Sequence, residues 1–388
     1  MPAGLARRGL YGLGAGARRG VPNRYGARGM SAEPDPTHLA YMPKLDGLRA
    51  IAVGLVLLQH FGPTAIASAL GAGGIGVKVF FVLSGYLITT ILLGYRDSAL
   101  TRLQATTQFY WRRFLRLTPA LYLALGAAWI LDIGDMRHDW WWFALYIYNF
   151  LVVARSDFGP VGHLWTLAVE EQFYLLWSLV VLFLPRRALV PTVIGLILLG
   201  PAYRIGLCLA GTNNFPQVLL PGNIDGLALG ALLALTQARG GGIVWRTATS
   251  PWTFILGVAG IAVLLALFGP NEWPRRVIYS CLVNLAAAYA VAVGAQAQTR
   301  KGSDWLAAPW LRHIGQISYG LYVYHYFLPQ IAKAYLPALY AAPTPARSVV
   351  YLAASFAVAE LSWRLLERPM RRWRRPAPPE VAAESVRT

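Results

Sequence analysis

The 388-residue sequence predicts an all-α fold, a polytopic membrane helix bundle of about ten transmembrane helices. Hydrophobic residues make up 56% of the chain and charged residues 13%, whereas a soluble domain carries roughly 25% charged residues. The mean hydropathy is +0.45. A membrane-spanning helix needs about 20 mostly apolar residues, and the chain has about ten runs of that kind. This composition excludes a large soluble domain.

The apolar runs follow one another along most of the chain, with short polar segments between them. A further aromatic run at residues 140–154 is short for a membrane span. The predicted spans are residues 45–64, 75–94, 114–132, 164–184, 188–208, 217–236, 251–269, 276–296, 314–335 and 347–366.

The loop charges predict how the chain is oriented in the membrane. Cytoplasmic loops carry an excess of Lys and Arg. All the main basic clusters fall on one side if the run 140–154 does not fully cross, which places both termini in the cytoplasm of a bacterial inner membrane. Arg275 and Arg276 are exceptions, since this scheme places them outside. The clusters lie at residues 96–113, 186–187, 239–246, 300–312 and 368–375.

Both ends of the chain differ in composition from the middle. The first 30 residues contain six arginines and no acid, so we predict a disordered basic arm over residues 1–40. Residues 370–388 are basic and proline-rich, which predicts a disordered tail. The transmembrane domain is then residues 41–369. Because the net charge of +18 comes from clusters beside apolar runs, it predicts membrane lipids or an anionic cofactor as partners rather than nucleic acid.

The first apolar run carries two polar residues, Arg49 and His60, that are 11 positions apart. At about 100° per residue both face the same side of a helix, roughly 16 Å apart along its axis. Arg49 would lie at the cytoplasmic edge and His60 deeper in the membrane. Ionisable residues at membrane depth are costly and are usually functional. The alternatives are an interface anchor for Arg49 and a packing role for His60.

The fourth run begins with His163 and contains the adjacent acids Glu170 and Glu171. His163, Glu170 and Tyr174 are spaced at i, i+7 and i+11 and so share a helical face. A carboxyl group in an apolar surrounding could hold or exchange a proton. The alternative is a structural hydrogen-bond anchor between helices. The sequence therefore offers a second set of candidate active-site residues.

Further polar residues lie inside or beside the other runs. Ser84 is next to a glycine, a pattern that often serves close helix packing. Asp225 is another acid at membrane depth, and His325 shares a helical face with other polar residues of the ninth run. The basic cluster before the third run is either an interface anchor or a site for an anionic group, since guanidinium groups bind phosphates in bidentate fashion. This cluster consists of Arg112, Arg113 and Arg116.

Seven segments of the chain resemble, in their order, those of the membrane acyltransferase-3 family of integral O-acyltransferases. The resemblance runs from about residue 45 to residue 369. The segments are LDGLRA at 45–50 with His60, VFFVLSGYLI at 79–88, RRFLRLTP at 112–119, HLWTLAVEEQFY at 163–174, DGLALG at 225–230, ISYGLY at 317–322 with His325, and ERP at 367–369.

The resemblance implies transfer of an acyl group, usually acetyl, from cytoplasmic acyl-CoA to a hydroxyl group of a cell-envelope or exported glycan. It implies no metal. By position, Arg49 and His60 would be the essential pair of the family, and Glu170 and Glu171 its paired acids. One departure is Asn223, where many relatives have an arginine two residues before the aspartate. Another is that the chain carries no fused extracytoplasmic hydrolase-like domain.

A mechanism follows as a hypothesis. The phosphates of CoA would bind Arg49 and the Arg112, Arg113 and Arg116 cluster, and the pantetheine arm would lie along the first helix and bring the thioester to His60. His60 would then act as a general base or as a transient acyl carrier. We assign the remaining membrane residues to the acceptor. They are His163, Tyr174, Ser84, Asp225 and His325.

Two other functions remain open from the sequence. A transporter or exporter of a glycan or small metabolite would use the polar face to line a pathway. Matching Gly/Pro breaks in two halves of the chain would favour it, and the sequence lacks that symmetry. A membrane glycosyltransferase or glycan polymerase would be expected to carry a large soluble loop or domain, which the sequence does not contain.

Overall fold

A computed structural model of the chain describes residues 41–63, 65, 67, 71–213, 215–269, 272–296, 304–370 and 373. These residues all belong to one unit, residues 36–388, which is described by itself here. Helices and the turns between them make up this part of the chain, and it contains no strand. The predicted all-α class is confirmed. The predicted basic arm, and all but Met370 and Trp373 of the predicted tail, lie outside the described residues.

Five helical segments in the described ranges are long and apolar enough to cross a membrane. A sixth candidate is a pair of helices, α10 (Gly242–Ala248) and α11 (Pro251–Leu267), that meet at a bend of 55°. The chain is therefore a polytopic helical membrane protein, while the count of ten spans stays a prediction. The five segments are α3 (Ala72–Asp97), Gly162–Phe183 with α7 (Trp165–Phe183), α8 (Arg186–Leu209), α12 (Trp273–Gly294) and Thr344–Met370 with α16 (Thr344–Ser362).

The remaining helices differ from the predicted runs at three places, one of which is α4, whose helix begins at Arg102, 12 residues before the run 114–132. The run 314–335 is interrupted at His325 and Tyr326, and the run 217–236 becomes α-helical only from Ile224. The helices are α1 (Pro43–Phe61), α4 (Arg102–Ile130), α5 (Met136–Ala144), α6 (Tyr148–Arg155), α9 (Ile224–Gln237), α13 (Pro309–Tyr324), α14 (Phe327–Tyr335), α15 (Pro337–Ala341) and α17 (Arg368–Met370). The short turns are Gly162–Leu164, Phe215–Val218, Leu220–Gly222, Asp304–Ala307 and the π-helical Trp363–Glu367.

The aromatic run 140–154 forms the two short helices α5 and α6. At 1.5 Å per residue they are about 14 and 12 Å long, well below the roughly 30 Å of a bilayer core. Arg155 ties them together, since its Nη2 donates to Asp139 Oδ1 at 2.9 Å. This bond raises the pKa of Arg155. Two such helices fit the expectation that this segment does not fully cross.

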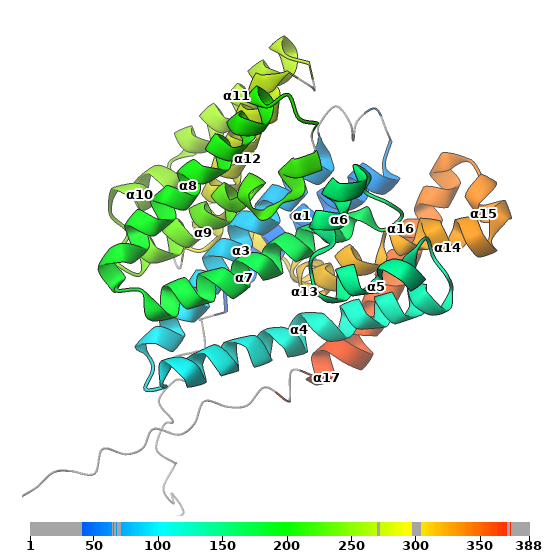
Figure 1. The fold of residues 1–388 in the computed structure, drawn as a ribbon, viewed down its shortest axis with the longest axis horizontal. Coiled ribbons are helices and arrows are strands. Elements are labelled where there is room, and N and C mark those ends of the chain that lie inside the picture. The colour runs from blue at the N-terminus through cyan, green and yellow to red at the C-terminus, as the bar shows by residue number, and fades with distance from the viewer. Residues whose placement is uncertain are drawn as a thin grey trace, which may run out of the picture. The chain divides into compact units, whose positions relative to one another are not determined.

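The helices α1, α3, α9 and α13 pack against one another in the order α13, α1, α3, α9. The backbones of α3 and α9 come very close because each helix has a glycine against the backbone of the other: a Cβ at Gly85 would clash with the Leu227 carbonyl, and one at Gly230 with the Val82 carbonyl. Small residues permit this approach between membrane helices. Figure 1 shows α8, α10, α11 and α12 toward one end of this core and α14 and α15 toward the other. The core holds the ends of α1 and α13 in fixed positions.

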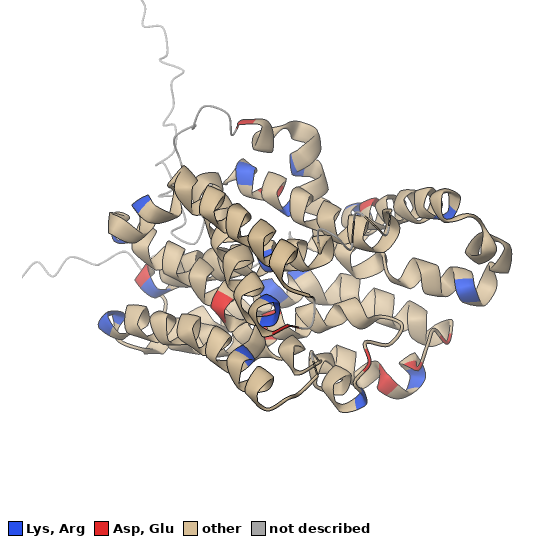
Figure 2. Cartoon of the chain, turned by 90° about the horizontal axis from the view of Figure 1, so that it is seen from above, with Lys and Arg blue, Asp and Glu red and all other residues tan. Residues whose placement is uncertain are grey.

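Local sequence explains where several helices begin. Proline occupies the first turn of α1, α11 and α13, where its missing N–H costs no helical hydrogen bond. The helix α4 starts with a capping box, in which Thr101 Oγ1 accepts from the Gln104 backbone and Gln104 Oε1 accepts from the Thr101 backbone. Figure 2 shows a largely uncharged bundle with few Lys, Arg, Asp and Glu residues.

The two arginines that break the loop-charge rule bind backbone carbonyls near the start of α12. Arg276 Nη2 donates to the Thr212 carbonyl at 3.1 Å, and Arg275 Nη1 donates to the Phe268 carbonyl at 3.4 Å. Arginine side chains near membrane interfaces can serve as such ties as well as orientation signals. Their position is therefore accounted for by loop packing.

Candidate active site

Three histidines from distant parts of the chain come together. His60 lies in the last turn of α1, His163 in the turn before α7, and His325 directly after α13. The ring centroids of His60 and His325 are 5.0 Å apart, and those of His163 and His325 are 4.9 Å apart. His325 is fully buried and His163 is 8% exposed, whereas His60 is exposed. The sequence had placed His163 and His325 with the acceptor, and had not brought them next to His60.

The hydrogen bonds of His325 fix which nitrogen of His60 is free. His325 Nδ1 lies 2.7 Å from the Tyr322 carbonyl, which can only accept, so Nδ1 carries the proton. In neutral His325, Nε2 must then accept. That nitrogen lies 3.2 Å from His60 Nδ1, which is also 2.9 Å from the Val56 carbonyl. Nδ1 of His60 is therefore the protonated nitrogen, and Nε2 of His60 carries the free lone pair.

His163 is held by a similar contact. Its Nε2 lies 3.2 Å from the Val323 carbonyl and must donate to it. The turn that carries it is fixed by Tyr322, whose hydroxyl donates to the His163 carbonyl at 2.8 Å and lies 2.5 Å from Thr166 Oγ1. The other ring nitrogen, His163 Nδ1, is buried and has no hydrogen-bond partner within the described part of the chain. It is an acceptor without a donor.

Tyr326 lies between the two outer histidines. Its ring centroid is 4.7 Å from that of His60 and 5.2 Å from that of His163. Tyr326 was not predicted from the sequence, although it follows His325 directly. The ranges that the structure describes contain no group of three potential ligands placed to hold a metal ion.

A second polar cluster gathers around the paired acids on α7. Glu170 accepts from Ser84 Oγ and from the Tyr174 hydroxyl, both at 2.9 Å. Arg113 reaches this cluster from α4: its Nη2 lies 3.4 Å from Glu171 Oε1, and its guanidinium lies 3.9 Å from the Tyr174 ring centroid. Cation–π contact and ion pairing together hold the arginine there. The hydrogen bonds of Glu170 thus go to Ser84 and Tyr174 rather than to His60.

The other predicted donor-binding arginines lie near the same cluster or along α4. Arg49 Nη1 is 3.7 Å from Asp46 Oδ1 one turn earlier, and its charge interacts with those of Glu170 and Arg113. The Arg112 guanidinium is 5.7 Å from the Tyr95 ring centroid. Arg116 is partly buried on α4. Arg49 and His60 mark two ends of α1, one beside the arginine and acid cluster and one beside the histidines.

A third polar cluster surrounds Asp225 at the start of α9. Arg204 of α8 binds it in bidentate fashion, with Nη1 to Oδ1 at 3.1 Å and Nη2 to Oδ2 at 2.8 Å. The side chains are 1% and 4% exposed. Asn284 Nδ2 also donates to Asp225 Oδ2 at 3.0 Å, and Lys78 Nζ donates to Asn223 Oδ1 at 3.0 Å. A buried carboxylate is thus enclosed by donors.

Arg204 was not singled out from the sequence, although a signal was present. It is an arginine within the predicted apolar run 188–208, and Asp225 needed a counter-charge at membrane depth. The role of Asp225 in binding the acceptor stays a prediction, and in this structure both of its oxygens accept hydrogen bonds from protein side chains.

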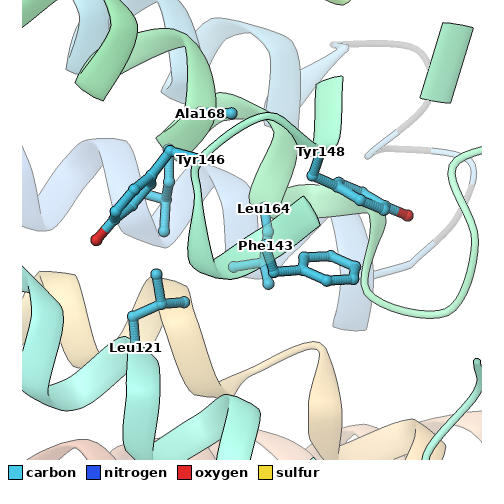
Figure 3. A pocket seen from close by; sticks show the side chains of 7 residues that line it. Leu121, Phe143, Tyr146, Tyr148, Leu164 and Ala168 are labelled. Atoms are coloured by element: carbon cyan, nitrogen blue, oxygen red, sulfur yellow. The ribbon is translucent and has the colours of Figure 1, made fainter. Parts of the chain in front are cut away.

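A small cavity lies close to the histidines, between α4, α7 and the segment that links α5 to α6 (Figure 3). It encloses about 10 Å³, room for about one water molecule. Leu164, next to His163, lines it. The other lining residues are Leu121, Phe143, Tyr146, Tyr148, Leu167 and Ala168. Its apolar walls identify it as a packing gap rather than as a substrate pocket.

A polytopic membrane protein with a buried cluster of histidines, acids and arginines belongs to the class of integral membrane enzymes. The family model described as an acyltransferase domain matches residues 42–364. The chain therefore belongs to the acyltransferase-3 family.

The chain is similar to named O-acetyltransferases. Peptidoglycan O-acetyltransferase OatA of Listeria monocytogenes is 30% identical over 371 residues, which cover 86% of this chain and 56% of that protein. O-acetyltransferase OatA of Staphylococcus aureus is 29% identical over 371 residues, 86% of this chain and 57% of that protein. The chain thus spans a little over half the length of these relatives. No solved structure matches it.

Proposed function

We propose that this protein is an acyl-CoA-dependent O-acetyltransferase that acetylates a hydroxyl group of a cell-envelope glycan. The observation that carries the proposal is the free Nε2 of His60, a basic nitrogen on an exposed side chain whose other nitrogen is held by His325 and Val56. Both relatives are O-acetyltransferases, which supports acetyl as the acyl group, and the Listeria monocytogenes relative, a peptidoglycan O-acetyltransferase, supports peptidoglycan as the acceptor class.

The donor side of the proposed site is the arginine cluster. Arg49, Arg112, Arg113 and Arg116 would bind the phosphates of acetyl-CoA, because guanidinium groups pair with phosphate in bidentate fashion. Arg49 and His60 are separated by 11 residues of α1, roughly 16 Å along the helix. The extended pantetheine arm has a comparable length. A donor with its phosphates at Arg49 would therefore bring its thioester to His60.

Two routes fit the free nitrogen of His60. As a general base, Nε2 would take the proton of the acceptor hydroxyl while that oxygen attacks the thioester. As a carrier, Nε2 would itself attack the thioester and hold the acetyl group until the acceptor arrives. Glu170, with Ser84 and Tyr174, would keep Arg113 and Arg49 in place on the donor side.

The same scheme places the donor site at the cytoplasmic face. The basic clusters between α3 and α4 and after α7 then lie in the cytoplasm, together with both termini. His60, at the other end of α1, faces the outer half of the bundle, where an envelope glycan would arrive. An acetyl group could thus cross most of the membrane along α1.

Replacing His60 with Ala tests the proposal. In membranes supplied with radiolabelled acetyl-CoA, we expect transfer of label to glycan to be lost while the variant remains folded and inserted. His138→Ala, which removes an exposed histidine of α5, is the matched control and should transfer normally. Transfer that persists in the His60 variant would rule the proposal out. The same assay separates an acyltransferase from a transporter, because only the former forms a new ester.

A further inference from the structure

We infer that His163 is a second base of the reaction, which takes the proton of the acceptor hydroxyl while His60 carries the acetyl group. The inference rests on the proposed function and deepens it. It divides the two routes open to His60 between two imidazoles: His60 receives the acetyl group, and His163 activates the acceptor.

The first observation is the vacant nitrogen of His163. Its Nε2 donates to the Val323 carbonyl, so in the neutral ring Nδ1 bears a lone pair. That atom is buried and has no partner in the described part of the chain, on a side chain that is 8% exposed. A buried acceptor without a donor costs free energy, because it has lost its hydrogen bonds to water. Such a cost marks an atom that is completed by a ligand, here a hydroxyl group.

The second observation is where His163 lies. His60 and His163 flank His325, with ring centroids 5.0 and 4.9 Å from it. Both also contact the ring of Tyr326, at 4.7 and 5.2 Å. An acceptor that attacks an acetyl group on His60 would therefore arrive within reach of His163.

The neighbouring groups are already occupied. Both nitrogens of His325 have partners, one the Tyr322 carbonyl and the other His60. Both oxygens of Glu170 accept hydrogen bonds, from Ser84 and Tyr174. Among these described groups, His163 offers a basic atom that no protein donor occupies. A general base must be available to its substrate as well as close to it.

The chemistry balances in two steps. In the first, His60 Nε2 attacks the thioester carbonyl carbon, the C–S bond breaks, and CoA leaves as a thiolate, while the Nδ1 proton of His60 stays between the Val56 carbonyl and His325 Nε2. In the second, the acceptor oxygen attacks the acetyl carbon, its proton passes to His163 Nδ1, and the C–N bond electrons return to His60 Nε2. The CoA thiolate takes up a proton from water, and His163 later releases its proton to water, so no net proton is gained or lost. The sum is thioester plus alcohol giving ester plus thiol.

The variant His163→Gln tests this division. The Gln side chain can keep a donor near the Val323 carbonyl but has no basic nitrogen. His138→Gln is the matched control on an exposed histidine. The two half-reactions are measured separately on purified full-length protein. One is the loading of label from radiolabelled acetyl-CoA onto the protein without acceptor, and the other is transfer of label to soluble peptidoglycan fragments and to the glycans of the source membranes.

We expect His163→Gln to load label within about twofold of the unchanged protein and to transfer it at least about 100-fold more slowly, the range of general-base catalysis. Transfer at the normal rate would overturn the inference. If His163→Gln loses both the loading of label onto the protein and its transfer, the inference is overturned too, because His163 would then act through the fold or through His60. His163→Asn, which also lacks a basic nitrogen, should behave as His163→Gln does and shows that the effect does not depend on one side chain.

The inference and the proposed function fail in different ways. If the unchanged protein transfers acetyl groups without ever becoming labelled, His60 is not a carrier and the division between the two histidines is wrong, while the proposed function stands. If the unchanged protein neither transfers nor becomes labelled, the proposed function itself is wrong.

Discussion

The Asp225 cluster and the histidine cluster are both polar clusters in the same bundle, but they differ in how completely they are paired. Both oxygens of Asp225 accept hydrogen bonds from Arg204 or Asn284. In the histidine cluster, Nε2 of His60 and Nδ1 of His163 are left with lone pairs. In a low-dielectric surrounding, paired groups make a structure rigid and unpaired groups cost free energy. From this difference we expect the first cluster to contribute stability and the second to take part in the chemistry.

The largest effect is expected from breaking the paired cluster. Asp225→Ala leaves Arg204 buried without its counter-charge, which should destabilise the protein by about 3–5 kcal/mol. Unfolding in detergent mixtures measures this loss. Asp135→Ala, an exposed loop acid, is the control and should change little. Replacing Arg204 and Asp225 together with Leu should recover much of the stability.

The Asp225→Ala variant also distinguishes between two roles for Asp225, a structural one and acceptor binding. If Asp225→Ala unfolds normally but raises the KM for the glycan acceptor, the residue binds the acceptor, as the sequence suggested. If the variant is less stable but its folded fraction has an unchanged KM for the acceptor, Asp225 and Arg204 form a structural pair.

The next largest effect is expected from His325→Ala, which removes the imidazole that orients His60. His325→Ala removes one of the two acceptors of His60 Nδ1–H and leaves the Val56 carbonyl alone to hold that proton, so more of His60 should adopt the unproductive tautomer. We expect kcat to fall about 100-fold with the KM for acetyl-CoA unchanged, since His325 does not contact the donor in this scheme. His313→Ala on the same helix is the control, because His313 is paired with Glu360 instead. A raised KM with an unchanged kcat would contradict a positioning role.

The smallest effect is expected at the donor end of α1. Arg49→Gln should raise the KM for acetyl-CoA about tenfold, because one charge-assisted phosphate contact is lost. S-acetylpantetheine, which lacks the nucleotide phosphates, provides a sharp control: with this donor the variant and the unchanged protein should have the same KM. Arg102→Gln on the exposed start of α4 should have no effect with either donor. An equal loss with both donors would move Arg49 out of the phosphate site.

The sequence predicted the parts of the site that lie on one element. Composition and run length identified the all-α membrane fold, and helical periodicity placed Arg49 and His60 on one face of α1. The spacing of Glu170 and Tyr174 likewise predicted neighbours, and the structure joins them by a hydrogen bond. These predictions succeed because a helix has a fixed repeat.

Contacts between elements could not be predicted in the same way. His60 and His325 are 265 positions apart, and their pairing depends on how α1 packs on α13. His163 was counted as part of a helix, but it lies in the turn before α7, where helical spacing does not apply. The contact between Arg204 and Asp225 is the exception. Both are charged residues within apolar runs, so they could have been paired by their opposite charges alone.

The interruption of the ninth run after Tyr324 has a consequence for how the site is assembled. A helix end leaves its last carbonyls without helical partners. The end of α13 uses two of them as fixed reference points: the Tyr322 carbonyl sets the proton on His325, and the Val323 carbonyl sets the proton on His163. Two adjacent peptide units thus determine the tautomers of His325 and His163, and His325 together with the Val56 carbonyl sets that of His60. The same helix terminus carries partial negative charge, so it also favours the transient positive charge that each imidazole acquires as a proton or an acetyl group passes through.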